Sequence, residues 1–269
     1  MKQLSKELLV RPGSRIKLED IDPSHTHGIS KAAAAAQLAK NLERLRVLQY
    51  LLYAEGRRSL LVVLQGIDAG GKDGTIQHVM SGLNPQGVRV TPFKVPEGSE
   101  KRHDYLWRVH RAVPEFGQMG IFNRSHYEDV LVVRVHNIVP KSVWSKRYAQ
   151  INDFERMLSD NGTRVVKFLL YIDKEEQAKR FHERIEDKTK NWKFSPADMK
   201  EREYWDQYID AYQDMLRKCS KRSAPWYVIP ANRKWFRNLA VSQVLCEELE
   251  SMSLKYPKPT ADLSGIKLE

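Results

Sequence analysis

Short apolar segments alternate with longer stretches of helical periodicity along most of the chain. Five of the short segments have the length and composition of buried strands, at residues 60–65, 88–91, 119–122, 165–172 and 226–229. Strands that alternate with helices form βαβ units, in which the strands lie parallel in one sheet. The pattern therefore predicts an α/β protein with three α/β/α layers around a central, mainly parallel sheet of about five strands.

A long amphipathic helix is predicted before the first strand, at residues 31–55. After an alanine run, its apolar side chains recur at helical spacing: Leu38, Leu42, Leu45, Leu48 and Leu52. Ser30 is a suitable N-cap, and Gly56 ends the pattern. These apolar positions are sufficient for the core or for a subunit contact, and we expect the protein to form a homo-oligomer.

The chain divides into an arm, one domain and a tail. Residues 1–29 contain prolines and glycines without a sustained period, which predicts an irregular arm that lies on the body or is partly mobile. Residues 30–255 show no clean internal boundary, so we expect a single domain there and a tail at 256–269.

Within the domain, a lid is predicted at about 184–205, where a basic and poorly periodic sequence at 184–194 precedes a helix start. Ser195, followed by Pro196, marks the start of a helix in this segment. Its apolar face would contain Trp205, Ile209, Tyr212 and Leu216.

The chain of 269 residues carries 45 lysines and arginines against 34 aspartates and glutamates, a formal net charge of +11. This excess points to a polyanionic partner, whether nucleic acid, acidic lipid or polyphosphate. Two cysteines, Cys219 and Cys246, cannot build a disulfide framework, and the N-terminal sequence has no apolar signal core. Because the longest apolar runs are too short to span a membrane, we expect a cytoplasmic protein without a membrane partner.

A glycine-rich loop, GIDAGGKDGT at 66–75, follows the first predicted strand and leads into a helical stretch at 75–83. Glycines allow successive backbone N–H groups to point inward, the helix adds its positive end, and Lys72 reaches the outer phosphates. The loop predicts a phosphate site whose other members are Ala69, Gly70, Gly71, Asp73, Gly74 and Thr75. A glycine-rich turn without a ligand is the alternative.

The metal ligands of this loop depart from the usual P-loop. Asp73 stands where Ser or Thr commonly holds magnesium, so the hydroxyl ligand is missing unless Thr75 replaces it. Asp68 would repel a bare phosphate unless a divalent cation lies between them, and we interpret it as a metal-side residue; capping of the loop is the alternative. For Asp73, a structural role is preferred over a functional one: its negative charge at the start of the helix interacts favourably with the helix dipole.

The third predicted strand places polar residues at the carboxyl edge of the sheet, where open α/β sheets bind ligands. Asn123 occupies the position at which P-loop enzymes usually have an aspartate for magnesium, so Glu128 and Asp68 become the anionic supports of the metal. Arg124 could fork across phosphate oxygens, and a surface salt bridge is its alternative. His126 is interpreted as a packing residue, because transfer to a phosphate needs no strong general base.

Basic residues gather in three further segments. Arg184 is our first choice for a lid cation that closes on phosphates, against the alternative of a solvated helix with i,i+4 ion pairs. A second cluster follows the fifth predicted strand and would face the ligand edge; it contains Arg233, Lys234 and Arg237. A third cluster contains Lys94 and Arg108. Cations spread in this way are suited to a long polyanion.

Several separated motifs together resemble the polyphosphate kinase 2 family. They are GIDAGGKDGT at 66–75, FKVP at 93–96, HDYLWR at 103–108, FNRSHYEDV at 122–130, NWKF at 191–194 and PWYVIP at 225–230. The resemblance covers about residues 30–255. It implies a P-loop kinase fold with a thymidylate-kinase-like core and a helical lid. It also implies Mg²⁺, or Mn²⁺, and phosphoryl transfer between inorganic polyphosphate and nucleotides.

The family's functional positions fall on residues that were selected above on chemical grounds. By resemblance the catalytic residues are Asp68, Lys72, Arg124 and Arg184, with Arg180 as the alternative lid arginine. The combination of Asn123 with Glu128 is similar to the class III branch. That branch phosphorylates both nucleoside monophosphates and diphosphates, which implies AMP and ADP, with GMP and GDP, as acceptors.

Two other functions share parts of this pattern. A nucleotide kinase that uses ATP has the same loop, lid and sheet, but it needs less positive charge than a net +11. A basic nucleic-acid-binding NTPase is compatible with the charge, although the cations follow strand ends and form no single dense run. We therefore expect polyphosphate and nucleoside mono-, di- and triphosphates as partners, in preference to nucleic acid.

Overall fold

The computed structural model describes residues 2–262, and residues 263–269 of the expected tail lie outside the described part. Its sheet has five strands, β1 (Ser59–Gln65), β2 (Val88–Pro92), β3 (Met119–Asn123), β4 (Thr163–Tyr171) and β5 (Trp226–Pro230). The strand order is β2-β3-β1-β4-β5, and every pairing is parallel. The predicted α/β fold and parallel sheet are confirmed.

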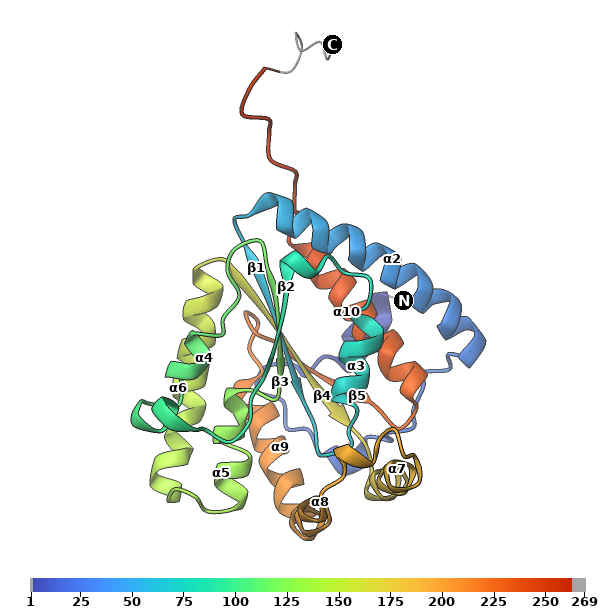
Figure 1. Ribbon diagram of the computed structural model, residues 1–269, viewed down its shortest axis with the longest axis vertical. Helices are drawn as coiled ribbons and strands as arrows, with labels where there is room; N and C mark the ends of the chain where they lie inside the picture. The colour runs from blue at the N-terminus through green and yellow to red at the C-terminus, as the bar shows by residue number, and fades with distance from the viewer. Residues whose placement is uncertain (1, 263–269) are drawn as a thin grey trace.

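Helices cover both faces of this sheet (Figure 1). One face packs against α2 (Lys31–Glu55), α3 (Lys72–Val79) and α10 (Lys234–Ser251), and the other against α4 (Trp107–His110), α5 (Val132–Val135), α6 (Lys141–Asp160) and α9 (Trp205–Cys219). Side chains of β1 alternate between the two cores, and all of them are buried. A strand covered on both faces has a continuous apolar run, which is why the pattern did not alternate.

Short 3₁₀ helices complete the connections. They are η1 (Leu18–Asp20), η2 (Pro85–Gly87), η3 (Gly98–Arg102), η4 (His126–Asp129), η5 (Asn191–Lys193) and η6 (Arg202–Tyr204). Because all strands are parallel, their carboxyl ends meet at one edge, the lower edge in Figure 1, next to α7 (Lys174–Glu186) and α8 (Pro196–Glu201). None of the helices within residues 2–262 is long and apolar enough to cross a membrane.

The long helix α2 has the predicted bounds. Ser30 caps it by accepting a hydrogen bond from the Ala33 amide, and Gly56 ends it in the left-handed conformation, with φ of 63°. Its inner face packs on α10, where Asn41 donates to Ser242 Oγ over 3.0 Å. The helix is therefore part of the core, while its outer face leaves Val47, Tyr50 and Tyr53 exposed.

The N-terminal arm is more regular than the sequence indicated. Residues Lys2–Leu8 form helix α1, and Leu9 then pairs antiparallel with Tyr227 at the edge of the sheet. Leu4 and Leu8 are buried in the core. The expectation of a wholly irregular arm is wrong, because a helix of two turns contains too few residues to show a hydrophobic period.

Two helices also differ from their predicted bounds. Helix α3 begins at Lys72, earlier than expected, because Gly71 adopts φ of 102° and so acts as the N-cap. The helix that begins after Ser195 is divided into α8 and α9 by η6. The Ser195 cap is present, with its hydroxyl accepting from the Ala197 amide over 3.2 Å.

Candidate active site

The P-loop connects β1 to α3 at the carboxyl edge of the sheet. Gly66, with φ of 155°, lies so close to β4 that a Cβ would be 2.7 Å from the Leu170 carbonyl oxygen. Ala69 has φ of 61°, and the Gly70 amide donates to the Ile67 carbonyl over 2.9 Å. The loop therefore needs glycine at position 66 for its backbone conformation and its close approach to β4, while Ala69 adopts the left-handed conformation with a side chain.

Lys72 is buried inside this loop. Its Nζ donates to the carbonyl oxygens of Gly66, over 2.6 Å, and Ile67, over 3.3 Å. Burial, together with the positive charge of nearby Arg124, lowers the pKa of Lys72 to about 8. Within the described residues, the ammonium group donates hydrogen bonds to these neutral carbonyls, and Asp68, Glu128 and Asp73 attract it without a hydrogen bond. An anion in the loop would stabilise it further.

Arg237 from α10 lies directly behind the loop. A Cβ on Gly71 would be 2.1 Å from its Nη1, so the guanidinium occupies the space that a side chain would need. Nε and Nη2 donate to Asn238 Oδ1 over 3.1 and 2.8 Å. Burial and the proximity of Arg180 lower the pKa of Arg237 to about 10, which leaves it charged at neutral pH.

Helix α7 holds the loop from a second side. Gln177 Nε2 donates to the Asp68 carbonyl oxygen over 2.9 Å, and Arg180 Nη1 donates to the Ala69 carbonyl oxygen over 2.9 Å. Arg180 also bonds Glu176 over 2.7 Å and the Asn232 carbonyl oxygen over 3.1 Å. Its guanidinium is therefore used to join the loop to the end of β5.

The end of β3 brings a second group of polar side chains to the loop. Asn123 Nδ2 donates to Asp73 Oδ1 over 2.8 Å. Arg124 forms ion pairs with Asp68 and, over 3.5 Å, with Glu128. Burial alone would lower the pKa of Arg124, but these two carboxylates raise it above its usual value. Residues that are far apart in sequence thus meet at the P-loop, where Arg124 lies between the carboxylates of Asp68 and Glu128 and Asn123 contacts Asp73.

The lid segment adds three charged groups above the loop. Lys193 Nζ lies 3.3 Å from Asp73 Oδ2, and Arg184 Nη1 lies 4.0 Å from Asp198 Oδ2. Burial, and then the negative charge of Asp68, raise the pKa of Asp198. Lys193 and Asp198 were not among the predicted site residues. Asp198 lies in the first turn of α8, where an acidic residue is favourable for the helix itself, and Lys193 is one of several basic residues in this segment.

The donor set suits a hard divalent cation that is shared with phosphate. Oxygen ligands are available from Asp68, Asp73, Asn123 and Glu128, and Mg²⁺ is commonly held by one or two carboxylates plus substrate phosphates. Among the described residues, no group of three or more His, Cys, Asp or Glu side chains is placed to hold a metal. Thr75 is buried and donates its hydroxyl proton to the Gly71 carbonyl oxygen over 3.0 Å, inside the helix.

The remaining predicted cations lie at the rim or apart. Arg233 Nε donates to the Ser24 carbonyl oxygen over 3.3 Å, and Lys234 pairs with Glu183 over 2.9 Å, both beside the loop. Arg108 pairs with Glu100 over 3.2 Å, and its Nη1 donates to the Lys94 carbonyl oxygen over 2.7 Å. In the described part of the chain, no hydrogen bond or ion pair joins Lys94 or Arg108 to the P-loop.

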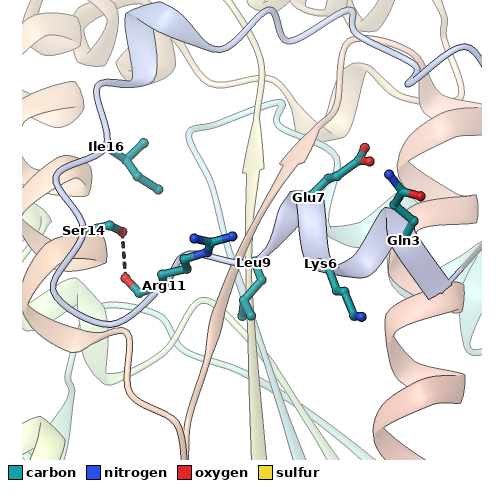
Figure 2. A pocket seen from close by; sticks show the side chains of 7 residues that line it. All are labelled: Gln3, Lys6, Glu7, Leu9, Arg11, Ser14 and Ile16. Atoms are coloured by element: carbon teal, nitrogen blue, oxygen red, sulfur yellow. Dashed lines mark hydrogen bonds between the residues drawn. The ribbon is translucent and has the colours of Figure 1, made fainter.

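A hollow of the surface lies away from this site. A groove of about 930 Å³ is formed by the N-terminal arm and is lined by Gln3, Lys6, Glu7, Leu9, Arg11, Ser14 and Ile16 (Figure 2). It lies outside the edge strand β5 and contains none of the residues that converge on the P-loop. The site is instead an open edge of charged side chains.

A parallel sheet whose first strand leads into a lysine-bearing glycine loop, with cations on a helical lid, defines a P-loop phosphotransferase. The sequence model of the polyphosphate kinase 2 family matches residues 28–257. The AMP/ADP-polyphosphate phosphotransferase of Meiothermus ruber is 52% identical over 266 residues, which cover 98% of this chain and 100% of that protein. The chain belongs to the polyphosphate kinase 2 family.

Other relatives agree with this assignment. The ADP-polyphosphate phosphotransferase of Rhodopseudomonas palustris is 46% identical over 276 residues, which cover 97% of this chain and 94% of that protein. The crystal structure of polyphosphate kinase 2 from Arthrobacter aurescens matches with a TM-score of 0.91 and 45% identity, covering 95% of this chain and 92% of that chain. The resemblance and the P-loop fold inferred from the motifs are confirmed.

Proposed function

We propose that this protein transfers the terminal phosphoryl group of inorganic polyphosphate to AMP and ADP, and to GMP and GDP, in a reversible reaction. The observation that carries the proposal is the convergence of Lys72, Arg124, Asp68 and Asp73 at one end of the sheet. This arrangement is suited to neutralising phosphate charge, and relatives that cover the whole chain are named as polyphosphate phosphotransferases for AMP/ADP and for ADP.

In this proposal the cations change partners when substrate binds. Lys72 leaves the loop carbonyls for a phosphate oxygen, and Arg124 leaves Asp68 to fork across the phosphoryl group. Arg184 closes from the lid and excludes water together with the rest of that segment. Neutralisation of the phosphoryl charge in the in-line transition state provides most of the rate acceleration.

A general base is not part of the mechanism. The acceptor phosphate is already anionic, and the only nearby histidine of the β3 turn, His126, is fully buried and bonded to Glu155 over 3.1 Å. Its role as a packing residue follows from that position.

We assign the metal role to Mg²⁺, with Mn²⁺ as a substitute. Asp68, Asn123 and Glu128 would hold it together with phosphate oxygens of the substrate, and Asp73 lies beside them, where it accepts a hydrogen bond from Asn123. When bound, the ion offsets phosphate charge beside a carboxylate-rich loop. Arg124 and Lys193, the present partners of Asp68 and Asp73, are the groups that such an ion would release toward phosphate.

The basic rim would bind the rest of a long chain. Arg233 and Lys234 are exposed beside the loop, and Arg237 lies behind it. Lys94 and Arg108 extend this proposal to the other side of the sheet edge. A cytoplasmic location and a homo-oligomer remain predictions that accompany the proposal.

The test is turnover of the purified protein with Mg²⁺ and long-chain polyphosphate, separately with AMP and ADP. Products are separated by anion-exchange chromatography, and Lys72→Ala is the control for the site. Formation of ATP from both acceptors supports the proposal and the class III assignment. Formation of ATP from ADP alone supports polyphosphate-driven transfer but rules out the class III assignment. Phosphorylation of nucleotides by ATP but not by polyphosphate would assign the protein to the ordinary nucleotide kinases.

A further inference from the structure

A charged pair lies in the interior of the protein, away from the phosphates. Lys167, on β4 next to the central strand β1, and Glu155, on α6, form an ion pair with side chains that are 0% and 1% exposed. Lys167 Nζ also donates to the Tyr127 hydroxyl oxygen over 2.8 Å and to the Cys219 carbonyl oxygen over 2.9 Å. All donors of the ammonium group are therefore used within the core.

The carboxylate of Glu155 binds two successive residues of the β3 turn. Its Oε1 accepts from the Tyr127 hydroxyl over 2.8 Å and contacts His126 Nε2 at 3.1 Å. Because an ionised carboxylate only accepts, His126 must donate from Nε2. These two residues begin η4, directly after Arg124 and Ser125, so the pair fixes the turn that carries the arginine.

The backbone at this turn requires such support. Arg124 has φ of 62°, in the left-handed region that a side-chain-bearing residue rarely adopts. Ser125 Oγ accepts from Gln65 Nε2 over 3.0 Å and from the Tyr127 amide over 3.1 Å, which joins the turn to β1. A strained conformation persists only where its surroundings determine it strongly.

Stability is a weak reason for burying these charges. Removing two charges from water is unfavourable, and well-packed apolar replacements of a buried pair are often neutral or stabilising. The contacts of this pair are instead directed to the turn that places Arg124 beside Asp68 and Glu128. A function in placing Arg124 explains why the charged pair is buried and why its contacts are made with this turn.

We propose that Glu155 and Lys167 are a positioning pair that sets the orientation of Arg124 for phosphoryl transfer. They touch no substrate, and they act through Tyr127 and His126. The inference rests on the proposed function in that it assigns Arg124 to the transferred phosphate.

The first test replaces the pair by apolar residues, Glu155→Leu with Lys167→Met. We expect the double variant to keep a melting temperature close to that of the wild type, with kcat for polyphosphate and ADP reduced by about 100-fold, as misplacement by about 1 Å produces. The matched control is Ser59→Ala with Thr163→Val, which removes a buried 2.9 Å contact between β1 and β4 at the amino ends of these strands, away from the P-loop. It should leave kcat unchanged. A folded apolar variant with wild-type kcat would overturn the proposal.

The second test also covers the case in which the apolar variant does not fold. Tyr127→Phe removes one hydroxyl and keeps the ring, and we expect it to lower kcat more than it raises the KM for ADP. In the Arg124→Ala background the same change should have no further effect on kcat, because the pair acts through that arginine. Equal losses in both backgrounds would show a merely structural role and reject the proposal.

A binding measurement separates this proposal from the proposed function. Calorimetric titration with inorganic tripolyphosphate needs no turnover, and we expect about tenfold weaker binding to Tyr127→Phe than to the wild type, equivalent to about 1.4 kcal/mol. If the wild type turns over no polyphosphate, the proposed function fails while this comparison still decides the pair. Equal affinities of the two proteins would contradict the positioning role.

Discussion

At the scale of single residues, each ion of the site is balanced by a group that phosphate or a metal can replace. Lys72 rests on two carbonyl oxygens, Arg124 on two carboxylates and Asp73 on Asn123 and Lys193. The sequence predicted Lys72, Asp68 and Arg124 as neighbours because strand ends meet at one edge of a parallel sheet. It could not predict which partners they would have, since these contacts depend on side-chain orientation.

The lowered pKa of Lys72 predicts a pH dependence. A lysine is a cation below its pKa, so raising the pH through about 8 removes the proton from the ligand-free enzyme. We expect log(kcat/KM) for polyphosphate to be level below that pH and to fall with a slope of about −1 above it, since kcat/KM reports free-enzyme groups. Lys72→Arg is the matched variant and should lack this limb. A profile of the wild type that stays level to about pH 10 would contradict the assignment.

Gly71 offers a test of the contact between the loop and Arg237. In Gly71→Ala the new Cβ would meet Nη1 at 2.1 Å, whereas in Gly82→Ala, with φ of 85°, it would meet no described atom within 4 Å. The control should lose about 1 to 2 kcal/mol of unfolding free energy from backbone strain and keep its activity. Gly71→Ala should lose more and also lose turnover. Urea unfolding and kcat measure both effects, and equal behaviour of the two variants would disprove the close packing.

At the scale of elements, local signals predicted what local physics determines. The strands could be located because an apolar run is a local signal. The bounds of α2 could be predicted because the capping residues Ser30 and Gly56 lie directly at its ends. Helix α1 was missed because it is too short to show a period, and the helix after Ser195 was not expected to break at η6. The contributions of Lys193 and Asp198 to the site depend on how the lid folds back on the loop, which no local pattern contains.

Helix α7 carries two arginines, Arg180 and Arg184, whose surroundings differ. The Arg180 side chain is 5% exposed and bonds Glu176 of its own helix, the P-loop and the segment after β5. The Arg184 side chain is 23% exposed and has one described ion pair, at 4.0 Å. We expect Arg184→Ala to reduce kcat by about 10³-fold, as loss of a transition-state arginine does, with an unchanged melting temperature. Arg180→Ala should instead destabilise the fold by about 3 to 5 kcal/mol, because it breaks a buried network. Thermal melts and kcat for both variants provide the test, and the reverse pattern would make Arg180 the lid arginine.

At the scale of the whole molecule, the net charge is +11, and the basic residues fall into two groups. Some form ion pairs with carboxylates, and others lie exposed at the rim beside the P-loop. Arg180 and Lys167 are engaged with carboxylates inside the protein, and Arg124 is engaged with carboxylates at the P-loop. Arg233 and Lys234 are exposed beside the P-loop, and the Lys234 pair with Glu183 is a surface contact that contributes little to stability. The rim therefore has charge available for a polyanion that is longer than a nucleotide.

This division predicts an effect of chain length that an ATP-dependent kinase would not show. We expect Arg233→Ala with Lys234→Ala to raise the KM for long-chain polyphosphate several-fold and to leave the KM for tripolyphosphate and ADP nearly unchanged. The salt dependence of the long-chain KM should weaken in the same variant, since each contact between a cation and a polyanion releases counterions. Lys40→Ala with Arg46→Ala, two exposed cations on α2, is the matched control and should change none of these values. Equal effects on long and short donors would mean that the rim acts only through the P-loop, and the polyanion would then be bound along another face of the protein.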